Sequence, residues 1–168
     1  MAGDDDTTDP LALANQLCFS VYSAAHAFTR LYRELLDSLG LTYTQYLVLL
    51  ALWQEDGLSV KRLGEELDLD SGTLTPLLRR LERAGYVQRR RGSLDERCVL
   101  VHLTEQARTI RPDIDRARKM VFDATGLSLA EVKDLQRNLE SVRAGLDTAA
   151  AAAGVRSRRR LTESSERA

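Results

Sequence analysis

The sequence contains few cysteines, few aromatic residues and no long apolar run. Only two of its 168 residues are cysteines, Cys18 and Cys98, which excludes a disulfide framework and predicts two free thiols. The longest apolar run, from Tyr46 to Trp53, is far shorter than the roughly 20 residues that span a membrane. The amino terminus is acidic and has neither the basic nor the apolar stretch of a secretory signal. These absences predict a cytoplasmic protein with no membrane partner.

A net charge of one sign is also missing, because 24 basic residues nearly balance 25 acidic ones. The charges are unevenly distributed. Residues 1–9 carry four aspartates and are predicted to be a disordered acidic terminus. Residues 71–97 hold seven arginines against three acidic residues, which makes a local basic surface. Residues 154–168 have five arginines and no apolar periodicity, so they are predicted to be a disordered basic tail, either solvated or in contact with phosphate.

Apolar residues recur every three or four positions at both ends of the chain. Over residues 10–39 they predict one long amphipathic helix that starts at a proline and is ended by Gly40. At 1.5 Å per residue this helix would be about 45 Å long, more than a domain of this size holds internally. Ser128 and Glu131 form a predicted capping box for a second such helix. Residues 10–39 and 105–153 are therefore interpreted as dimerisation helices.

Between these helices, residues 42–104 are predicted to form a winged helix-turn-helix. Three short helices come first. Thr42 and Gln45 form a predicted capping box for the first, which carries Trp53 to the core, and Ser59 caps the second. The third, over about residues 72–84, is expected to face inward with Leu74, Leu77, Leu78 and Leu81. Thr104 is expected to cap a further helix at the end of this segment. Two strands, 86–91 and 98–103, follow around a polar turn and form a hairpin, the wing. The predicted fold class is mainly α with a small β-hairpin wing, and residues 10–153 are expected to form a single domain.

A DNA-contacting surface is predicted on the last of these helices and on the hairpin. A helix fits the major groove, where polar side chains and arginine reach base edges, and a basic hairpin can follow phosphates or enter the minor groove. The predicted contacts of the helix are Ser71, Thr73, Thr75, Pro76, Arg79 and Arg80. Those of the hairpin are Arg89, Arg90, Asp95 and Arg97, with Asp95 expected to hold Arg97 in an extended pose. A merely solvated basic face is the alternative.

Three stretches of the sequence resemble a known family. The runs LTYTQYLVLLALW and LSVKRLGEELDLDSGTLTPLLRRLERAGYVQRRRGSLDERCVLVHLTEQA resemble the MarR family of winged-helix transcriptional regulators, a likeness that spans most of residues 10–147. The stretch LCFSVYSAAHAFTRLYRELLDSLGLTYTQY, around Cys18, resembles the organic-hydroperoxide-sensing OhrR branch. The resemblance implies a homodimeric repressor that binds a palindromic DNA operator and releases it when an organic hydroperoxide oxidises Cys18. It also implies that Tyr32 and Tyr43 of the other subunit support the Cys18 thiolate.

Other roles for the two cysteines stay open. A helix that begins at residue 10 places Cys18 beyond its first turn, and no basic residue lies within four positions of it. In the alternative hypothesis Cys18 is structural and a small aromatic or phenolic ligand releases the DNA. Cys98 is interpreted as a strand residue, with a disulfide partner as the minority interpretation. The sequence lacks the late second cysteine of one OhrR subgroup, which favours capping of Cys18 by a low-molecular-weight thiol.

No enzyme activity, metal or other cofactor is expected. The two histidines, His26 and His102, lie apart from any cluster with metal-ligand spacing. A thiol peroxidase that uses Cys18 is a third hypothesis, but no second catalytic group and no resolving cysteine lie near it in the sequence.

Overall fold

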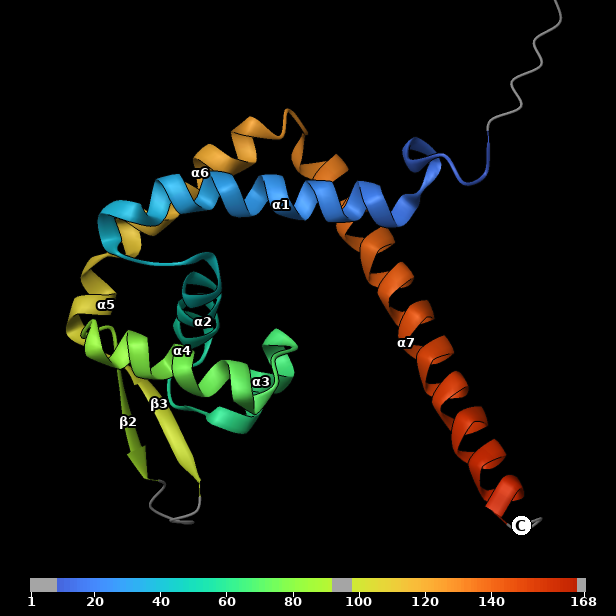
Figure 1. The fold of residues 1–168 in the computed structure, drawn as a ribbon. Helices are drawn as coiled ribbons and strands as arrows, with labels where there is room; N and C mark the ends of the chain where they lie inside the picture. Colours follow the sequence, from blue (N-terminus) through green and yellow to red (C-terminus); the bar gives the residue numbers. More distant parts are fainter. Residues whose placement is uncertain (1–8, 92–97, 166–168) are drawn as a thin grey trace, which may run out of the picture. The chain divides into compact units, whose positions relative to one another are not determined.

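The computed structural model describes residues 9–91 and 98–165, with side chains described as far as Gly154. The chain divides into two compact units, Met1–Val121 and Phe122–Ala168, where the sequence predicted a single domain. The first unit contains the winged helix-turn-helix (Figure 1). Its helices and strands, in chain order, are η1 (Leu13–Asn15), α1 (Leu17–Leu36), η2 (Asp37–Leu39), α2 (Tyr43–Gln54), β1 (Leu58–Ser59), α3 (Val60–Leu67), α4 (Ser71–Arg83), β2 (Val87–Arg91), β3 (Val99–Leu103), α5 (Glu105–Thr109) and the greater part of α6 (Arg111–Ala124).

The first long helix is shorter than predicted. The expected start at Pro10 is wrong, because the backbone of Ala12 and Gln16 is extended and α1 begins only at Leu17. A 20-residue helix is about 30 Å long rather than 45 Å. Cys18 is consequently the second residue of α1 and lies in its first turn, not beyond it.

The predicted helix caps are largely confirmed. Thr42 and Gln45 form both halves of the capping box at the start of α2. The side chains of Ser59 and Thr104 accept hydrogen bonds from the first turns of α3 and α5. Asp70, which the sequence did not single out, caps α4. Side-chain oxygens at these positions satisfy backbone N–H groups that have no partner within the helix, and so fix where each helix begins.

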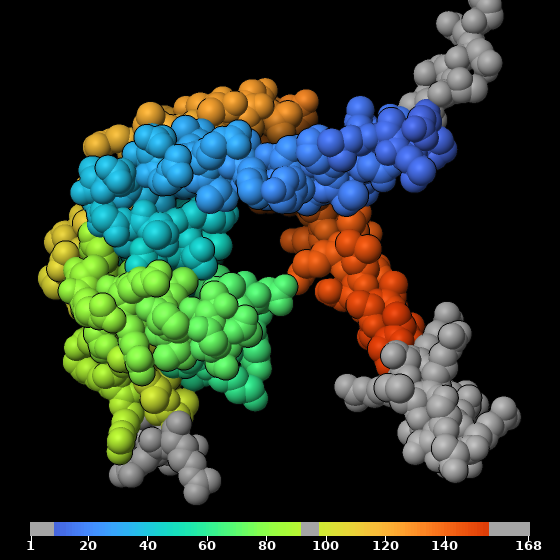
Figure 2. Space-filling view, viewed as in Figure 1, coloured from blue at the N-terminus to red at the C-terminus, as the bar shows by residue number. Residues whose placement is uncertain are grey.

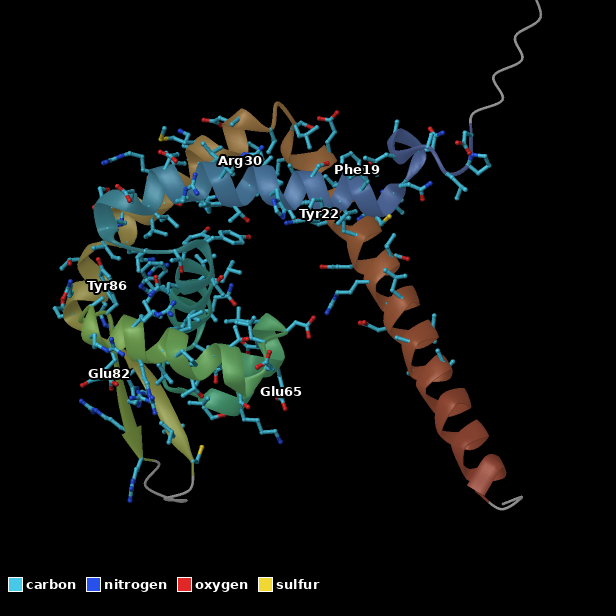
Figure 3. All side chains as sticks on the ribbon, viewed as in Figure 1. Phe19, Tyr22, Arg30, Glu65, Glu82 and Tyr86 are labelled. Carbon is cyan, nitrogen blue, oxygen red and sulfur yellow. The ribbon has the colours of Figure 1, made fainter. Side chains whose placement is uncertain are left out.

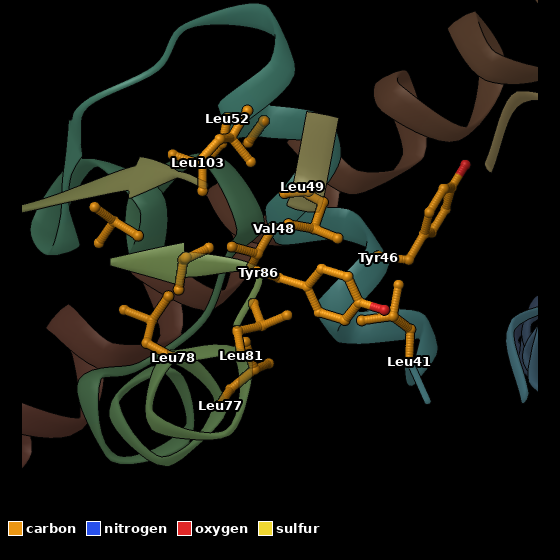
Figure 4. Packing of buried hydrophobic residues seen from close by; sticks show 14 of the residues in the cluster. Leu41, Tyr46, Val48, Leu49, Leu52, Leu77, Leu78, Leu81, Tyr86 and Leu103 are labelled. Atoms are coloured by element: carbon orange, nitrogen blue, oxygen red, sulfur yellow. The ribbon is translucent and has the colours of Figure 1, made fainter. Parts of the chain in front are cut away.

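The core of the winged unit lies between α2, α4 and the sheet (Figure 4). The four leucines predicted to face inward from α4 are all buried: Leu74, Leu77, Leu78 and Leu81. From α2 the most completely buried side chains are those of Val48, Leu49 and Leu52. Because one face of α4 is fully used for packing, the opposite face is left to polar side chains.

The three strands form an antiparallel sheet in the order β1-β3-β2. β2 and β3 form the predicted hairpin, with Val87 opposite Leu103 and Arg91 opposite Val99. In the space-filling view the hairpin projects from the body of the winged unit (Figure 2). β1 pairs Leu58 with Val101. It was not predicted, because two residues are too few to show an alternating pattern.

Asp56, in the turn between α2 and β1, connects three elements. Its Oδ1 accepts hydrogen bonds from the backbone N–H groups of Gly57 at 3.0 Å and Leu103 at 2.8 Å, and its Oδ2 accepts one from Arg108 at 2.8 Å. Gly57 has φ +79°, and a Cβ atom there would lie 2.8 Å from Cε1 of His102, so this turn requires glycine. The carboxylate thus ties the turn to the end of β3 and to α5.

The second unit is dominated by α7, which spans Leu129–Ser165. The predicted capping box of Ser128 and Glu131 is present. The helix continues past Gly154, where the sequence predicted a disordered tail, and the alanine-rich and arginine-rich composition of this stretch has high helix propensity. The large apolar side chains that α7 exposes are Leu129, Leu135, Leu139, Val142 and Leu146.

Within residues 9–91 and 98–165, no single helix is long and apolar enough to cross a membrane. The helical segment Leu17–Leu39 and α2 reach the required length and composition only together, and they are bent by 74° at their junction. Half of the α2 side chains are buried in the core of the winged unit.

Candidate nucleic-acid interface and tyrosine cluster

The exposed face of α4 carries most of the predicted DNA contacts. The predicted residues on this face are Ser71, Thr73, Pro76, Arg79 and Arg80, and Thr75 beside them is half-buried. All lie away from the four buried leucines of the same helix. Among the described residues, Arg79 and Arg80 form no ion pair, so both guanidinium groups face solvent. The face can therefore offer hydroxyl groups and two free cations to one ligand surface.

Asp70 restricts the hydrogen bonding of Thr73. Its Oδ1 accepts from the Thr73 backbone N–H at 2.9 Å and its Oδ2 accepts from the Thr73 hydroxyl at 3.0 Å. These bonds, the backbone bond first, hold the pKa of Asp70 below its usual value. Because the Thr73 hydroxyl donates its proton to Asp70, it can accept but not donate a further hydrogen bond.

The arginines of the hairpin divide between its two faces. Arg89 points toward α4, where its Nε and Nη2 donate to Oε2 of Glu82 at 3.0 and 2.6 Å (Figure 3 labels Glu82). Arg90 is exposed, and its Nη2 donates to the side chain of Gln88 at 3.1 Å. The sequence treated Arg89 and Arg90 alike, but only Arg90 faces solvent with most of its guanidinium unpaired. The predicted contacts Asp95 and Arg97 lie outside the described residues.

Three tyrosines meet where α1 packs on α2. The ring of Tyr32 lies 5.0 Å from that of Tyr43 and 4.9 Å from that of Tyr46, between centroids. Tyr32 and Tyr46 are buried, and their hydroxyl oxygens are 3.4 Å apart. Figure 4 shows Tyr46 at the margin of the leucine core, with its hydroxyl directed away from it. The resemblance to the OhrR branch implied that Tyr32 and Tyr43 support the thiolate, and it implied no role for Tyr46. The position of Tyr46, one helical turn after Tyr43, could have indicated that the two side chains lie on the same face of α2.

Two members of the tyrosine cluster, Tyr43 and Tyr46, are neutral hydrogen-bond donors. Burial is the main cause that raises the pKa of Tyr43 above its ordinary value. Burial also raises the pKa of Tyr46, and the hydrogen bond with Tyr32 raises it further. Phenols with raised pKa values keep their protons at neutral pH, so these hydroxyl groups can donate to an anion.

Cys18 is distant from the tyrosine cluster of its own chain. Fourteen positions of α1 separate Cys18 from Tyr32, which corresponds to about 21 Å at 1.5 Å per residue. Cys18 is exposed, and one turn further along α1 the exposed ring of Tyr22 lies on the ring of His26, with centroids 4.2 Å apart (Figure 3). Cys98 is half-buried beside β3. The structure thus brings Tyr32 and Tyr43 together but not with Cys18 of the same chain.

A cavity of about 240 Å³ lies between α2 and α6. It is lined by Leu50, Trp53, Gln54, Arg111, Ile114, Asp115 and Arg118. The indole Nε1 of Trp53 is buried and has no hydrogen-bond partner among the described residues. Sequence reasoning assigned Trp53 to the core and did not predict this cavity, because its two walls come from helices about sixty residues apart in the chain.

Known proteins of similar sequence are transcriptional regulators. The family model described as transcriptional regulator SarA/Rot matches residues 30–114. The HTH-type transcriptional regulator TtmR of Methylorubrum extorquens is 54% identical over 135 residues, which cover 80% of this chain and 69% of that protein. The organic hydroperoxide resistance transcriptional regulator of Bacillus subtilis is 44% identical over 129 residues, which cover 77% of this chain and 86% of that protein.

Solved structures give the same architecture. The structure of reduced AbfR bound to DNA has 39% sequence identity and a TM-score of 0.68, and the match covers 80% of this chain and 93% of that chain. The crystal structure of AbfR of Staphylococcus epidermidis has 34% identity and a TM-score of 0.66, with 80% and 92% covered. The crystal structure of MarR, at 22% identity and a TM-score of 0.66 with 84% and 92% covered, shows the common fold alone.

Proposed function

Because this chain belongs to the MarR-like SarA/Rot family of winged-helix transcriptional regulators, which bind DNA and are not enzymes, we propose that it is a repressor that senses organic hydroperoxides through Cys18. The observation that carries this proposal is the cluster of phenols at Tyr32, Tyr43 and Tyr46 in a chain that is 44% identical to a hydroperoxide resistance regulator. Such a cluster can bind a thiolate and lose it on oxidation.

The DNA is contacted by α4 and the hairpin in this proposal. Thr73, Thr75 and Arg79 reach base edges in the major groove, and Arg80 and Arg90 contact phosphates. The exposed side chains and free guanidinium groups of α4 support these roles. A two-fold symmetric dimer would read two half-sites about 34–36 Å apart, which accounts for a palindromic operator.

A second copy of the chain completes the sensor. Over residues 17–28, α1 exposes five large apolar side chains, Leu17, Phe19, Val21, Tyr22 and Phe28. Leu17, Val21 and Phe28 share one face of the helix by their spacing, and an exposed apolar face is typical of a protein–protein interface. Since Cys18 lies about 21 Å along α1 from its own Tyr32, the thiolate can meet Tyr32 and Tyr43 only across such an interface.

The chemistry begins with the thiolate. Cys18 lies in the first turn of α1, where the partial positive charge of the helix terminus stabilises an anion. The thiolate sulfur attacks one peroxide oxygen, the O–O bond breaks, and the leaving alkoxide takes a proton to become an alcohol. The sulfur is oxidised by two electrons to a sulfenic acid, which condenses with a low-molecular-weight thiol and releases water. Either product removes the negative charge that the phenols bind.

Redox states of a relative support this chemistry. One AbfR structure is that of the reduced protein bound to DNA, another that of the overoxidised protein bound to DNA, and a third that of a disulfide-formed protein, at 37–39% identity. In the present chain the second cysteine, Cys98, is half-buried beside β3. A mixed disulfide of Cys18 with a small thiol is therefore the oxidised form that we propose.

The test is DNA binding before and after oxidation. Fluorescence anisotropy with the DNA upstream of the protein's own gene is measured at fixed salt, before and after one equivalent of cumene hydroperoxide and a small thiol. We expect the wild type and the Cys98→Ser control to release the DNA and Cys18→Ser to keep it. Release by Cys18→Ser, or retention by the wild type, would overturn the proposal.

The cavity between α2 and α6 favours a second candidate function, release by a small aromatic acid. Its lining combines apolar Leu50 and Ile114 with the cation of Arg111, which suits a ring with a carboxylate, whereas Arg118 is paired with the lining carboxylate of Asp115 at 3.0 Å. Under this alternative, salicylate releases the DNA from Cys18→Ser as well as from the wild type, and Arg111→Gln abolishes the effect. Absence of any salicylate effect on DNA binding would exclude it.

A further inference from the structure

Alternation along β2 assigns its arginines to different surroundings. Successive residues of a strand face opposite sides of the sheet, so Arg89 shares a side with Val87, which is 1% exposed. That side faces α4. Gln88 and Arg90 share the other side, and a hydrogen bond joins them. Arg89 is consequently directed into the junction between α4 and β2, although the next residue, Arg90, is exposed.

Glu82, in the last turn of α4, receives Arg89 through three hydrogen bonds. Oε2 accepts from Nε at 3.0 Å and from Nη2 at 2.6 Å, and Oε1 accepts from the Arg89 backbone N–H at 3.2 Å. Both carboxylate oxygens are used, and the side chains are only 30% and 35% exposed. The backbone bond matters most for geometry, because it fixes the strand itself, and not only a flexible side chain, to the end of the helix.

The pair brings no net charge to the DNA-facing surface. A guanidinium whose Nε and Nη2 donate to a carboxylate is neutralised locally and cannot also contact a phosphate without breaking those bonds. Arg79, Arg80 and Arg90 have no acidic partner among the described residues. These three are available cations, as are the exposed Arg83 and Arg91, whereas Arg89 is already paired.

We infer that Glu82 and Arg89 are positioning residues for DNA binding: they hold the recognition helix and the wing at one fixed angle, so that both reach the same duplex together. Two elements held in this way bind as one unit, whereas a hinge between them would have to be ordered on binding, which lowers affinity. The inference depends on DNA binding by the family and not on hydroperoxide sensing.

The experiment is a double-mutant cycle on DNA binding by the full-length protein. The variants are Glu82→Gln, Arg89→Gln and the two together, with Arg89→Lys as a conservative variant and Arg90→Gln as the matched control on the other side of β2. Anisotropy is measured with the upstream DNA and with a scrambled duplex of equal length, at several salt concentrations. Circular dichroism at the assay temperature checks that each variant is folded.

For positioning residues we expect each single substitution to weaken binding of the upstream DNA about tenfold, with the double variant no weaker than either single one. The dependence of affinity on salt should stay as in the wild type, and the scrambled duplex should bind as before. Arg89→Lys should lose affinity like Arg89→Gln, because a single ammonium group cannot reproduce the two bonds that Nε and Nη2 donate to Oε2.

Three results would overturn the inference. The first concerns the dependence of DNA affinity on salt. If Arg89→Gln releases about one counterion fewer per subunit than the wild type does, as Arg90→Gln would, then Arg89 is a phosphate contact. The second is tighter binding by Glu82→Gln, which would mean that Glu82 only masks a useful charge. The third is unchanged affinity in folded Glu82→Gln and Arg89→Gln.

Discussion

The carboxylate of Asp56 offers a sharp test of how the winged unit is held together. Replacing it by alanine removes the acceptor for the backbone N–H of Leu103, a residue only 4% exposed, and breaks the ion pair with Arg108. A buried donor left without a partner costs about 1–3 kcal/mol. The half-exposed ion pair adds about 0–1 kcal/mol.

Together these losses should lower the free energy of unfolding of Asp56→Ala by about 1–4 kcal/mol. For a chain of this length that corresponds to a melting temperature lower by about 2–16 °C. The assay is thermal and urea unfolding at one fixed protein concentration, since association of subunits also contributes to stability.

Glu65→Ala is the matched control. Among the described residues that carboxylate forms one ion pair, with Lys61 at 3.8 Å, and both side chains are well exposed, so its removal should change stability by less than about 0.5 kcal/mol. A loss below about 0.5 kcal/mol in Asp56→Ala would refute the reasoning, because it would mean that the three hydrogen bonds of Asp56 are replaced by water at no cost.

Three further predictions concern the core, the pH dependence and the sensor. Leu63 is fully buried, so Leu63→Ala should cost about 2–5 kcal/mol in urea unfolding, and a smaller loss would mean that the site collapses around the cavity. Arg89 and the strand N–H hold the pKa of Glu82 below its ordinary value, so the unfolded chain binds the proton more tightly. The stability difference between wild type and Glu82→Gln should thus be full at pH 7 and shrink as the pH falls below about 4, and a pH-independent difference would contradict this. Tyr46→Phe removes the hydrogen bond to Tyr32 and should slow release of DNA by cumene hydroperoxide about fivefold, the equivalent of about 1 kcal/mol, whereas Tyr86→Phe, which loses a bond to Leu39, should not.

What the sequence predicted correctly depends on local rules. The four inward leucines of α4 and the capping box of Thr42 and Gln45 follow from spacings of three and four residues, and both are confirmed. The misplaced start of α1 shows the limit of such rules, because a proline and an aspartate also suit a turn. Here the extended backbone at Gln16 delays the helix to Leu17.

The candidate site was predicted in residue type but not in arrangement. The contact of Glu82 with Arg89 crosses a helix-to-strand turn, and that of Asp56 with Arg108 spans 52 positions. No period in the sequence reports such pairs, since they depend on how the elements pack. The same holds for the cavity between α2 and α6.

The length of α1 between Cys18 and Tyr32 has a consequence for mixed dimers. When a thiol is served by tyrosines of the other subunit, a dimer of one Cys18→Ser chain and one Tyr32→Phe chain has one complete sensor, and its other sensor lacks both groups. When each subunit serves itself, the same dimer has two damaged sensors and none complete. Mixing two inactive variants would then restore hydroperoxide-dependent release of DNA in the first case only. Complementation between subunits therefore shows whether each sensor is built from one chain or from two.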